Sequence, residues 1–107
     1  MKKITHNKLV RDKIPELLKK KNILCKIKIL NDKEYKESLN KKLQEEVSEF
    51  LASKDNEWLE EMADIFEVML AILKTKNSNF EKLEKIRKLK FDNKGGFSEK
   101  ILLEKTL

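Results

Sequence analysis

Between Pro15 and Gly95 the sequence contains neither proline nor glycine. These two residues commonly end helices and form tight turns, so their scarcity favours a few long helices over many short strands. A chain of 107 residues is one domain by length and is long enough to bury a core without disulfides. We therefore expect residues 1–107 to form a single domain that is mainly α-helical.

Helix-capping residues and apolar periodicity divide this domain into four helices. The first is predicted to begin near Pro15 and to run through the sequence PELLKKK. Asn31 or Asp32 can cap a second helix that reaches about Ser53. For the two remaining helices we expect a third from Glu57 to about Lys76, capped by Asp55, and a fourth that begins in the capping box Ser78–Glu81 and ends near Asn93.

Two segments carry a strand pattern instead. Apolar residues alternate with Lys26 and Lys28 across residues 23–29, and the tail at residues 97–103 is a second short candidate. Two strands are marginally stable alone, so they must lie on the helices or across a dimer contact. The predicted fold class is thus a helical bundle with a small two-stranded β element.

Nothing in the sequence indicates a membrane or secreted protein. The longest apolar run, residues 68–73, is far below the roughly 18 residues of a membrane span. The start, MKKITHNKLV, lacks the apolar core of a signal peptide. Cys25 is the single cysteine and cannot form an intrachain disulfide, which fits a reducing compartment. We expect a cytoplasmic protein.

The charge of the chain is unevenly distributed. The formal net charge is +6, yet most acidic residues lie in residues 31–73, and basic residues dominate both ends. The acidic middle would repel nucleic-acid phosphates, which argues against a nucleic-acid-binding protein. A centrally held cation with a polyanion bound by lysines fits this distribution better.

Four carboxylates fall on the margins of predicted apolar stripes. At about 100° per residue, Glu46 lies within the stripe formed by Leu39, Leu43 and Phe50, with Glu49 at its edge. On the next helix, Glu61 and Asp64 border the apolar face that includes Ile72. The short connection favours antiparallel packing of these two helices, which would bring the two acidic pairs together.

Converging carboxylates in a half-buried seam need neutralisation, by protons or by a divalent cation. Oxygen-only ligands without nearby Cys or His indicate Mg²⁺, or alternatively Mn²⁺, rather than Zn²⁺. An alternative remains open at this point. The acids can instead form solvated helix faces that pair with Lys41, Lys42 or Lys54, for a few tenths of a kcal/mol each.

Three motifs in order resemble a known family. They are NKLVRDKIPE at residues 7–16, EEVSE at 45–49 followed by EMAD at 61–64, and KGGF at 94–97. Together they resemble the MazG-like, all-α nucleoside triphosphate pyrophosphohydrolases, in the subgroup described as phosphoribosyl-ATP pyrophosphohydrolase-like. The resemblance covers nearly the whole chain.

The resemblance implies Mg²⁺-dependent cleavage of a nucleotide between its α and β phosphates, which releases a monophosphate and pyrophosphate. It implies Glu46, Glu49, Glu61 and Asp64 as metal ligands, so Glu46 would also be part of the catalytic centre. Glu45 would orient or deprotonate the attacking water. The candidates to bind substrate phosphates are Lys8, Arg11, Lys13 and Lys94. We expect Asp12 simply to pair with Arg11.

Two departures from the family pattern bear on substrate geometry. Only eleven residues separate Glu49 from Glu61, which requires a tight connection, and Lys94 stands where relatives often have Arg. Family members tend to be dimers or tetramers, and the wide apolar arc of the third helix also indicates a homo-oligomer. Alternative functions are true phosphoribosyl-ATP hydrolysis and a non-catalytic helical interaction module that retains the acidic seam.

Overall fold

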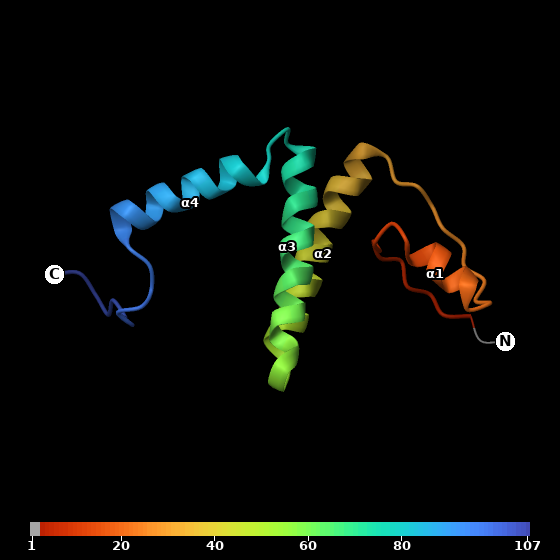
Figure 1. Cartoon of the computed structure of the whole chain (residues 1–107), viewed down its shortest axis with the longest axis horizontal. Coiled ribbons are helices and arrows are strands. Elements are labelled where there is room, and N and C mark those ends of the chain that lie inside the picture. Colours follow the sequence, from red (N-terminus) through yellow and green to blue (C-terminus); the bar gives the residue numbers. More distant parts are fainter. Residues whose placement is uncertain (1–2) are drawn as a thin grey trace.

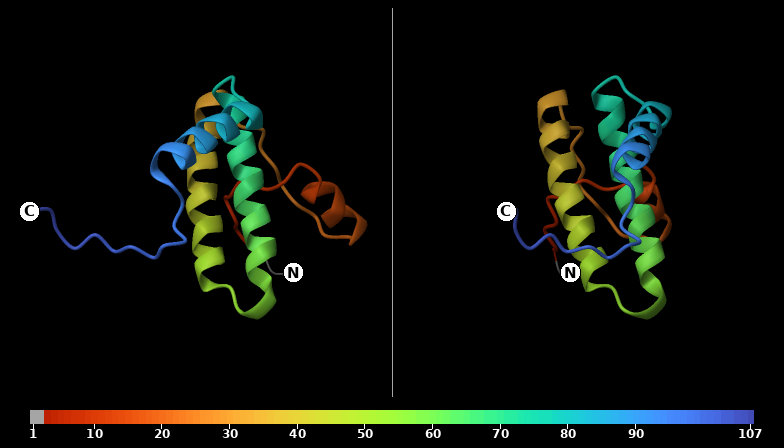
Figure 2. Two further views of the ribbon diagram at one scale, coloured as in Figure 1. Left: turned by 60° about the vertical axis from the view of Figure 1, so that its left-hand side comes forward. Right: turned by 90° about the vertical axis from the view of Figure 1, so that its left-hand side faces the viewer.

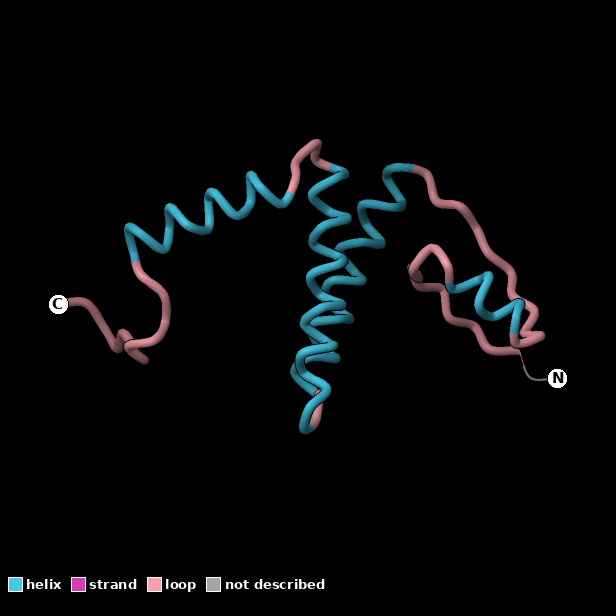
Figure 3. Tube along the Cα trace, in the orientation of Figure 1, coloured by secondary structure: helices cyan, strands magenta, loops and turns pink. Residues whose placement is uncertain are grey.

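The computed structural model describes residues 3–107, and in this part of the chain it contains four α-helices and no strand (Figure 1). Loops join the helices and form both ends of the chain (Figure 3). None of the helices combines the length and the apolar character needed to cross a membrane. The helices are α1 (Ile14–Lys20), α2 (Asp32–Ala52), α3 (Trp58–Thr75) and α4 (Phe80–Lys94), with a 3₁₀ turn, η1 (Asp55–Glu57), before α3.

The centre of the molecule is an antiparallel hairpin of α2 and α3 (Figure 2). The apolar stripes of the two helices face each other, and Leu39 and Val68 are the most enclosed apolar side chains of the described residues, with 3% and 8% exposure. The antiparallel packing predicted from the short connection is confirmed. This hairpin is the element that positions the acidic residues.

Of the two residues predicted to cap α2, Asn31 is the one that does so. Its side chain accepts a hydrogen bond from the Glu34 N–H at 2.8 Å, and the Glu34 side chain accepts from the Asn31 N–H at 3.2 Å. This reciprocal pair satisfies two amides that the helix itself leaves unbonded. Lys28 also forms an ion pair with Glu34 at 2.8 Å. The start of the acidic helix is therefore well defined.

The caps predicted for the third and fourth helices are wrong in detail. Asp55 makes no capping hydrogen bond and instead begins η1, with a positive φ of 52°. Asn79, not Ser78, caps α4, because its extended backbone lets its side chain accept from the Lys82 N–H at 2.9 Å. The Ser78 N–H is engaged elsewhere, donating to the Leu73 carbonyl at the end of α3.

The predicted β element is absent from the described residues. Residues 23–30 and 97–103 have no ladder hydrogen bonds, and they lie at opposite sides of the molecule (Figures 1 and 3). A strand needs a neighbour to bond its backbone, and neither segment has one among residues 3–107. The apolar residues from Ile23 to Ile29 consequently remain exposed, as do Cys25 and the tail.

The molecule is extended for its length. Its radius of gyration is 18.5 Å, whereas a compact domain of this size has about 13 Å. Helices α1 and α4 project from opposite sides of the hairpin (Figures 1 and 2). Phe66 on α3 contacts Phe80 at the start of α4, with ring centroids 5.7 Å apart, and Gly95 ends α4 with a φ of 79°.

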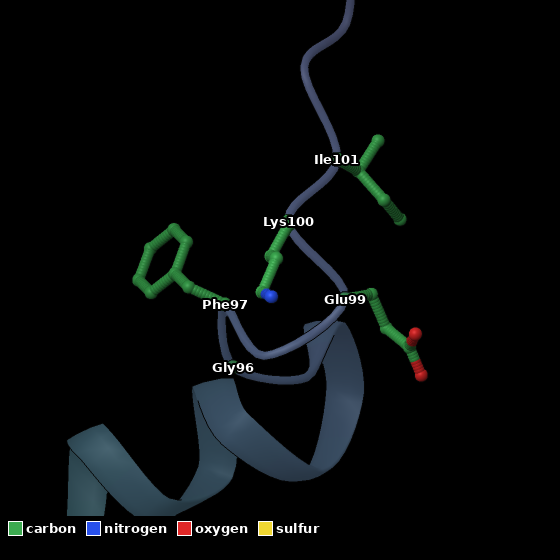
Figure 4. Close-up of a pocket in the computed structure, with 5 residues that line it drawn as sticks. All are labelled: Gly96, Phe97, Glu99, Lys100 and Ile101. Atoms are coloured by element: carbon green, nitrogen blue, oxygen red, sulfur yellow. The ribbon is translucent and has the colours of Figure 1, made fainter.

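The tail beyond α4 forms an open turn with a hollow of about 210 Å³ (Figure 4). Phe97, on its rim, is 99% exposed, and Glu99 and Lys100 contribute one charge of each sign. The hollow has no convergent set of like charges and no buried polar group. It belongs to the exposed arm and is not a candidate active site.

Candidate metal centre

The hairpin brings Glu46 of α2 together with Glu61 and Asp64 of α3. One carboxylate oxygen from each of the three lies within 4.8 Å of the others. Glu46 is only 6% exposed, which makes it more enclosed than Val68, and the other two are half-buried. Three of the four ligands implied by the resemblance therefore converge.

The fourth implied ligand, Glu49, lies at the rim of this cluster. Its side chain is exposed, and it is not among the three residues whose oxygens converge. A hydrogen bond shared with the Glu46 carboxylate, together with some burial and the charge of Glu61, raises the pKa of Glu49. It is thus electrostatically part of the cluster, although it is more accessible than the others.

Two buried oxygen atoms in the cluster have no hydrogen-bond partner, Oε2 of Glu46 and Oε2 of Glu61. Burial, followed by the charges of Asp64 and Glu46, raises the pKa of Glu61. An unpartnered buried carboxylate oxygen is costly, and buried charges are normally paired or bound to metal. Carboxylate oxygens are the ligands that Mg²⁺ and Mn²⁺ prefer. The donor set therefore fits a hard divalent cation.

Three basic side chains lie against the acidic cluster. Lys42 contacts Glu45 at 3.4 Å and Glu46 at 3.2 Å, and Lys8 contacts the same Glu45 oxygen at 3.3 Å. Arg11 donates to Asp64 at 2.7 Å. The expected pairing of Arg11 with Asp12 is wrong, because the N-terminal segment approaches the hairpin and offers Arg11 a carboxylate from α3.

These contacts change the role expected of Glu45. Burial by itself would raise its pKa, but Lys42 and Lys8 together hold the pKa of Glu45 below its usual range. A carboxylate held by two ammonium groups is a weak proton acceptor. Its geometry suits the positioning of lysines better than the deprotonation of water.

The other predicted phosphate-binding residues fall in two groups. Arg11 contacts Asp64 of the cluster and Lys8 contacts the neighbouring Glu45, whereas Lys13 is exposed at the start of α1. Lys94 is the last residue of α4, which projects from the hairpin on the side opposite α1 (Figure 1). Within one chain the structure thus does not bring Lys94 to the carboxylates.

Lys42 is the functional candidate that the sequence reasoning treated only as a surface pairing residue. Its side chain is 17% exposed and bridges two carboxylates of the cluster. Its spacing in the sequence indicates this contact. Lys42 lies three positions before Glu45 and four before Glu46, and residues at these spacings share a helix face. Once Glu46 was placed in the apolar stripe, Lys42 had to lie beside a desolvated charge.

Comparison of the chain with protein-family models, with curated proteins and with solved structures finds no significant match.

The raised pKa values predict how stability depends on pH in metal-free protein. A carboxyl whose pKa is higher in the folded state binds protons more tightly there, so stability falls as pH rises from 4.5 through the raised pKa values of Glu49 and Glu61. Urea unfolding with a chelator present should show this decline, with a smaller slope in Glu61→Gln. Glu67→Gln, on the exposed face of α3, is the control and should keep the slope. Stability that rises over this window would contradict the crowded cluster.

Addition of Mg²⁺ should reverse the loss of stability that accompanies ionisation of these carboxylates. A cation that binds only the folded state stabilises it, by about 2.7 kcal/mol at a concentration of about 100 times its Kd. Thermal unfolding should therefore shift upward with Mg²⁺ in the wild type and in Glu67→Gln. The shift should disappear in Glu46→Gln and shrink strongly in Glu61→Gln. Equal shifts in all four proteins would place the bound cation elsewhere.

Proposed function

We propose that the chain is a divalent-cation-dependent nucleotide pyrophosphohydrolase of the MazG-like type. It would cleave a nucleoside triphosphate, or a related nucleotide, between the α and β phosphates and release a monophosphate and pyrophosphate. Such an activity would remove non-standard or excess nucleotides, and we place it in the cytoplasm, where nucleotides are made and used. The cofactor would be Mg²⁺, with Mn²⁺ as the alternative.

One observation carries this proposal. Buried oxygens of Glu46 and Glu61 lack any partner in a seam that also contains Asp64. A purely structural seam would gain stability from apolar side chains at these positions, because burying charge without full compensation costs free energy. The retained carboxylates are explained by a bound cation, and the basic residues around them are explained by an anionic substrate.

The resident side chains divide the work of the reaction. Glu46, Glu61 and Asp64 would hold the cation, and Glu49 at the rim would complete its shell or bind a water. When bound, the cation supplies charge neutralisation and a polarised water. Arg11 would move from Asp64 to a substrate phosphate, because a guanidinium binds phosphate as readily as carboxylate.

The chemical change itself is a hydrolysis at phosphorus. A water oxygen would form the new bond to the α phosphorus as the bond from this phosphorus to the bridging oxygen breaks. Pyrophosphate would leave with the electron pair, and one proton of the attacking water would pass to solvent. The positive charges of Lys8, Lys42 and Arg11 would stabilise the negative charge that develops on the leaving group. Positioning and electrostatics therefore account for the contribution of these residues.

The direct test is a pyrophosphate-release assay with Mg²⁺ and a panel of canonical and modified nucleoside triphosphates, plus phosphoribosyl-ATP. We expect turnover of one or a few substrates. Glu46→Gln, which keeps the shape but removes the charge, should reduce kcat by at least about 100-fold, and Glu67→Gln should leave it unchanged. The fold reduction corresponds to about 2.7 kcal/mol of lost transition-state stabilisation.

Release of pyrophosphate from phosphoribosyl-ATP alone would assign the narrower biosynthetic activity. If a folded protein binds Mg²⁺ but acts on no member of the panel, the catalytic proposal fails. The acidic seam would then belong to a non-catalytic helical module with a structural cation.

We further propose that the protein works as a homo-oligomer, a dimer or a tetramer. Several apolar residues of α4 and the tail are more than half exposed, among them Ile86, Leu89, Phe91, Phe97 and Ile101. Basic residues outnumber acidic ones on α4, whereas the α2–α3 hairpin is acidic. A second copy could therefore cover α4 through apolar contact with complementary charge, and would offer a route for Lys94 to reach a neighbouring acidic cluster.

Sedimentation analysis should then give a mass larger than that of one chain. Leu89→Ser on α4 should weaken association about tenfold, because loss of one packed leucine removes about 1.5 kcal/mol. Asn93→Ser, which changes neither the charge nor the apolar surface of α4, is the control and should have little effect. A wild-type protein that remains monomeric at high concentration would contradict the oligomer.

A further inference from the structure

A small hollow lies next to the acidic cluster, and most of its charged lining residues are basic. It has a volume of about 50 Å³, larger than the space of one water molecule. Asn7, Lys8 and Leu9 line it from the N-terminal segment, and the remaining lining residues, Ser38, Lys41, Lys42 and Glu45, lie on α2. The α2 residues are spaced at three, four and seven positions, so they share one face of the helix.

Charge in this hollow is out of balance. Lys8 and Lys42 both contact the same oxygen, Oε1 of Glu45, at 3.3 and 3.4 Å. Lys41 forms no ion pair with any residue from 3 to 107. The lining thus contains three lysines and one carboxylate, two of the lysines contact that carboxylate, and Ser38 and Asn7 add a hydroxyl and an amide group. This composition is suited to an anion with several oxygens.

The Lys42 side chain links the hollow to the candidate metal centre. Lys42 reaches Glu45 in the hollow and Glu46 in the acidic cluster, at 3.4 and 3.2 Å. An anion in the hollow would therefore lie one side chain away from the carboxylates that would hold the cation. A nucleotide polyphosphate fits this arrangement, because the phosphorus atom at which it reacts is adjacent to its terminal phosphates.

We infer that the hollow between the N-terminal segment and α2 binds the terminal phosphates of a nucleotide, with Glu45 as a built-in competing anion. This assignment rests on the function proposed above, and it adds Lys41 to the residues that contact substrate. The bound phosphates replace Glu45 as the partner of Lys8 and Lys42. Glu45 keeps the two lysines together before substrate arrives, and its charge opposes binding.

The test measures binding of inorganic pyrophosphate by calorimetry, with a chelator present so that neither turnover nor the cation is needed. Lys41→Met should weaken binding about fivefold. Glu45→Gln should strengthen pyrophosphate binding about fivefold, because pyrophosphate then no longer competes with a carboxylate for Lys8 and Lys42. The magnitude follows from the strength of partly exposed ion pairs, each of which changes an affinity roughly two- to fivefold. Lys36→Met, on an exposed part of α2 outside the hollow, is the control and should leave binding unchanged.

Lys42→Arg keeps the charge and the partner of Glu46, so it should fold normally and retain binding within about threefold. A single-stranded oligonucleotide, whose phosphates are diesters with one charge each, is the second probe and should bind more weakly than pyrophosphate. Equal binding of the oligonucleotide would assign the lysines to a nucleic-acid backbone and overturn the inference.

The outcomes separate this inference from the proposed function. Pyrophosphate binding that follows Lys41 and Glu45 supports the hollow even if no nucleotide in the panel is hydrolysed. Nucleotide hydrolysis that depends on Glu46, combined with pyrophosphate binding that ignores Lys41 and Glu45, overturns the hollow and leaves the activity in place. Absence of measurable pyrophosphate binding, or weaker binding in Glu45→Gln, also overturns it.

Discussion

The enclosed carboxylate of Glu46 is the constraint to which the neighbouring side chains respond. It lies in the seam between α2 and α3 with 6% exposure, where an unpaired charge would cost several kcal/mol. Lys42, one helical turn earlier, provides one partner for it at 3.2 Å. The second oxygen has none, and Glu61 across the seam presents an unpartnered oxygen of its own. The hairpin is therefore held by apolar packing around a group of incompletely paired carboxylates, and these carboxylates are the basis of the proposed metal site.

The ion pairs around these carboxylates involve side chains that a metal ion or a substrate would also contact. Lys8 and Lys42 share Glu45, and Arg11 pairs with Asp64. Each of these basic side chains therefore occupies a carboxylate that lies in the proposed metal site or next to it. A divalent cation would release Arg11 by taking Asp64 and would free Lys42 from Glu46, and a polyphosphate would receive those basic groups. The two ligands would then support each other's binding without any change in the backbone, because each removes a competitor of the other.

The sequence was sufficient for those features that depend on local rules. The helical period places Glu46, Glu61 and Asp64 on the faces that meet, and the spacing of Asn31 and Glu34 defines the start of α2. The choice between two adjacent capping residues was less certain. Ser78 and Asn79 can both cap a helix, and only the path of the chain out of α3 selects Asn79. Long-range pairing was not accessible: the partner of Arg11 lies 53 positions away, and strand-like alternation at residues 23–29 says nothing about whether a neighbouring strand exists.

The N-terminal segment illustrates why such pairing matters for function. It contributes little buried apolar surface, as Leu9 is half-buried and Val10 is 40% exposed, so its position on the hairpin depends largely on the contacts of Lys8 and Arg11. Partly exposed ion pairs are weak and are screened by salt. The segment is therefore held by the same groups that a substrate would engage, and a polyanion that draws Lys8 and Arg11 inward would replace the contacts it breaks. Attachment of this segment and binding of a polyanion would then be coupled, because both would use the side chains of Lys8 and Arg11.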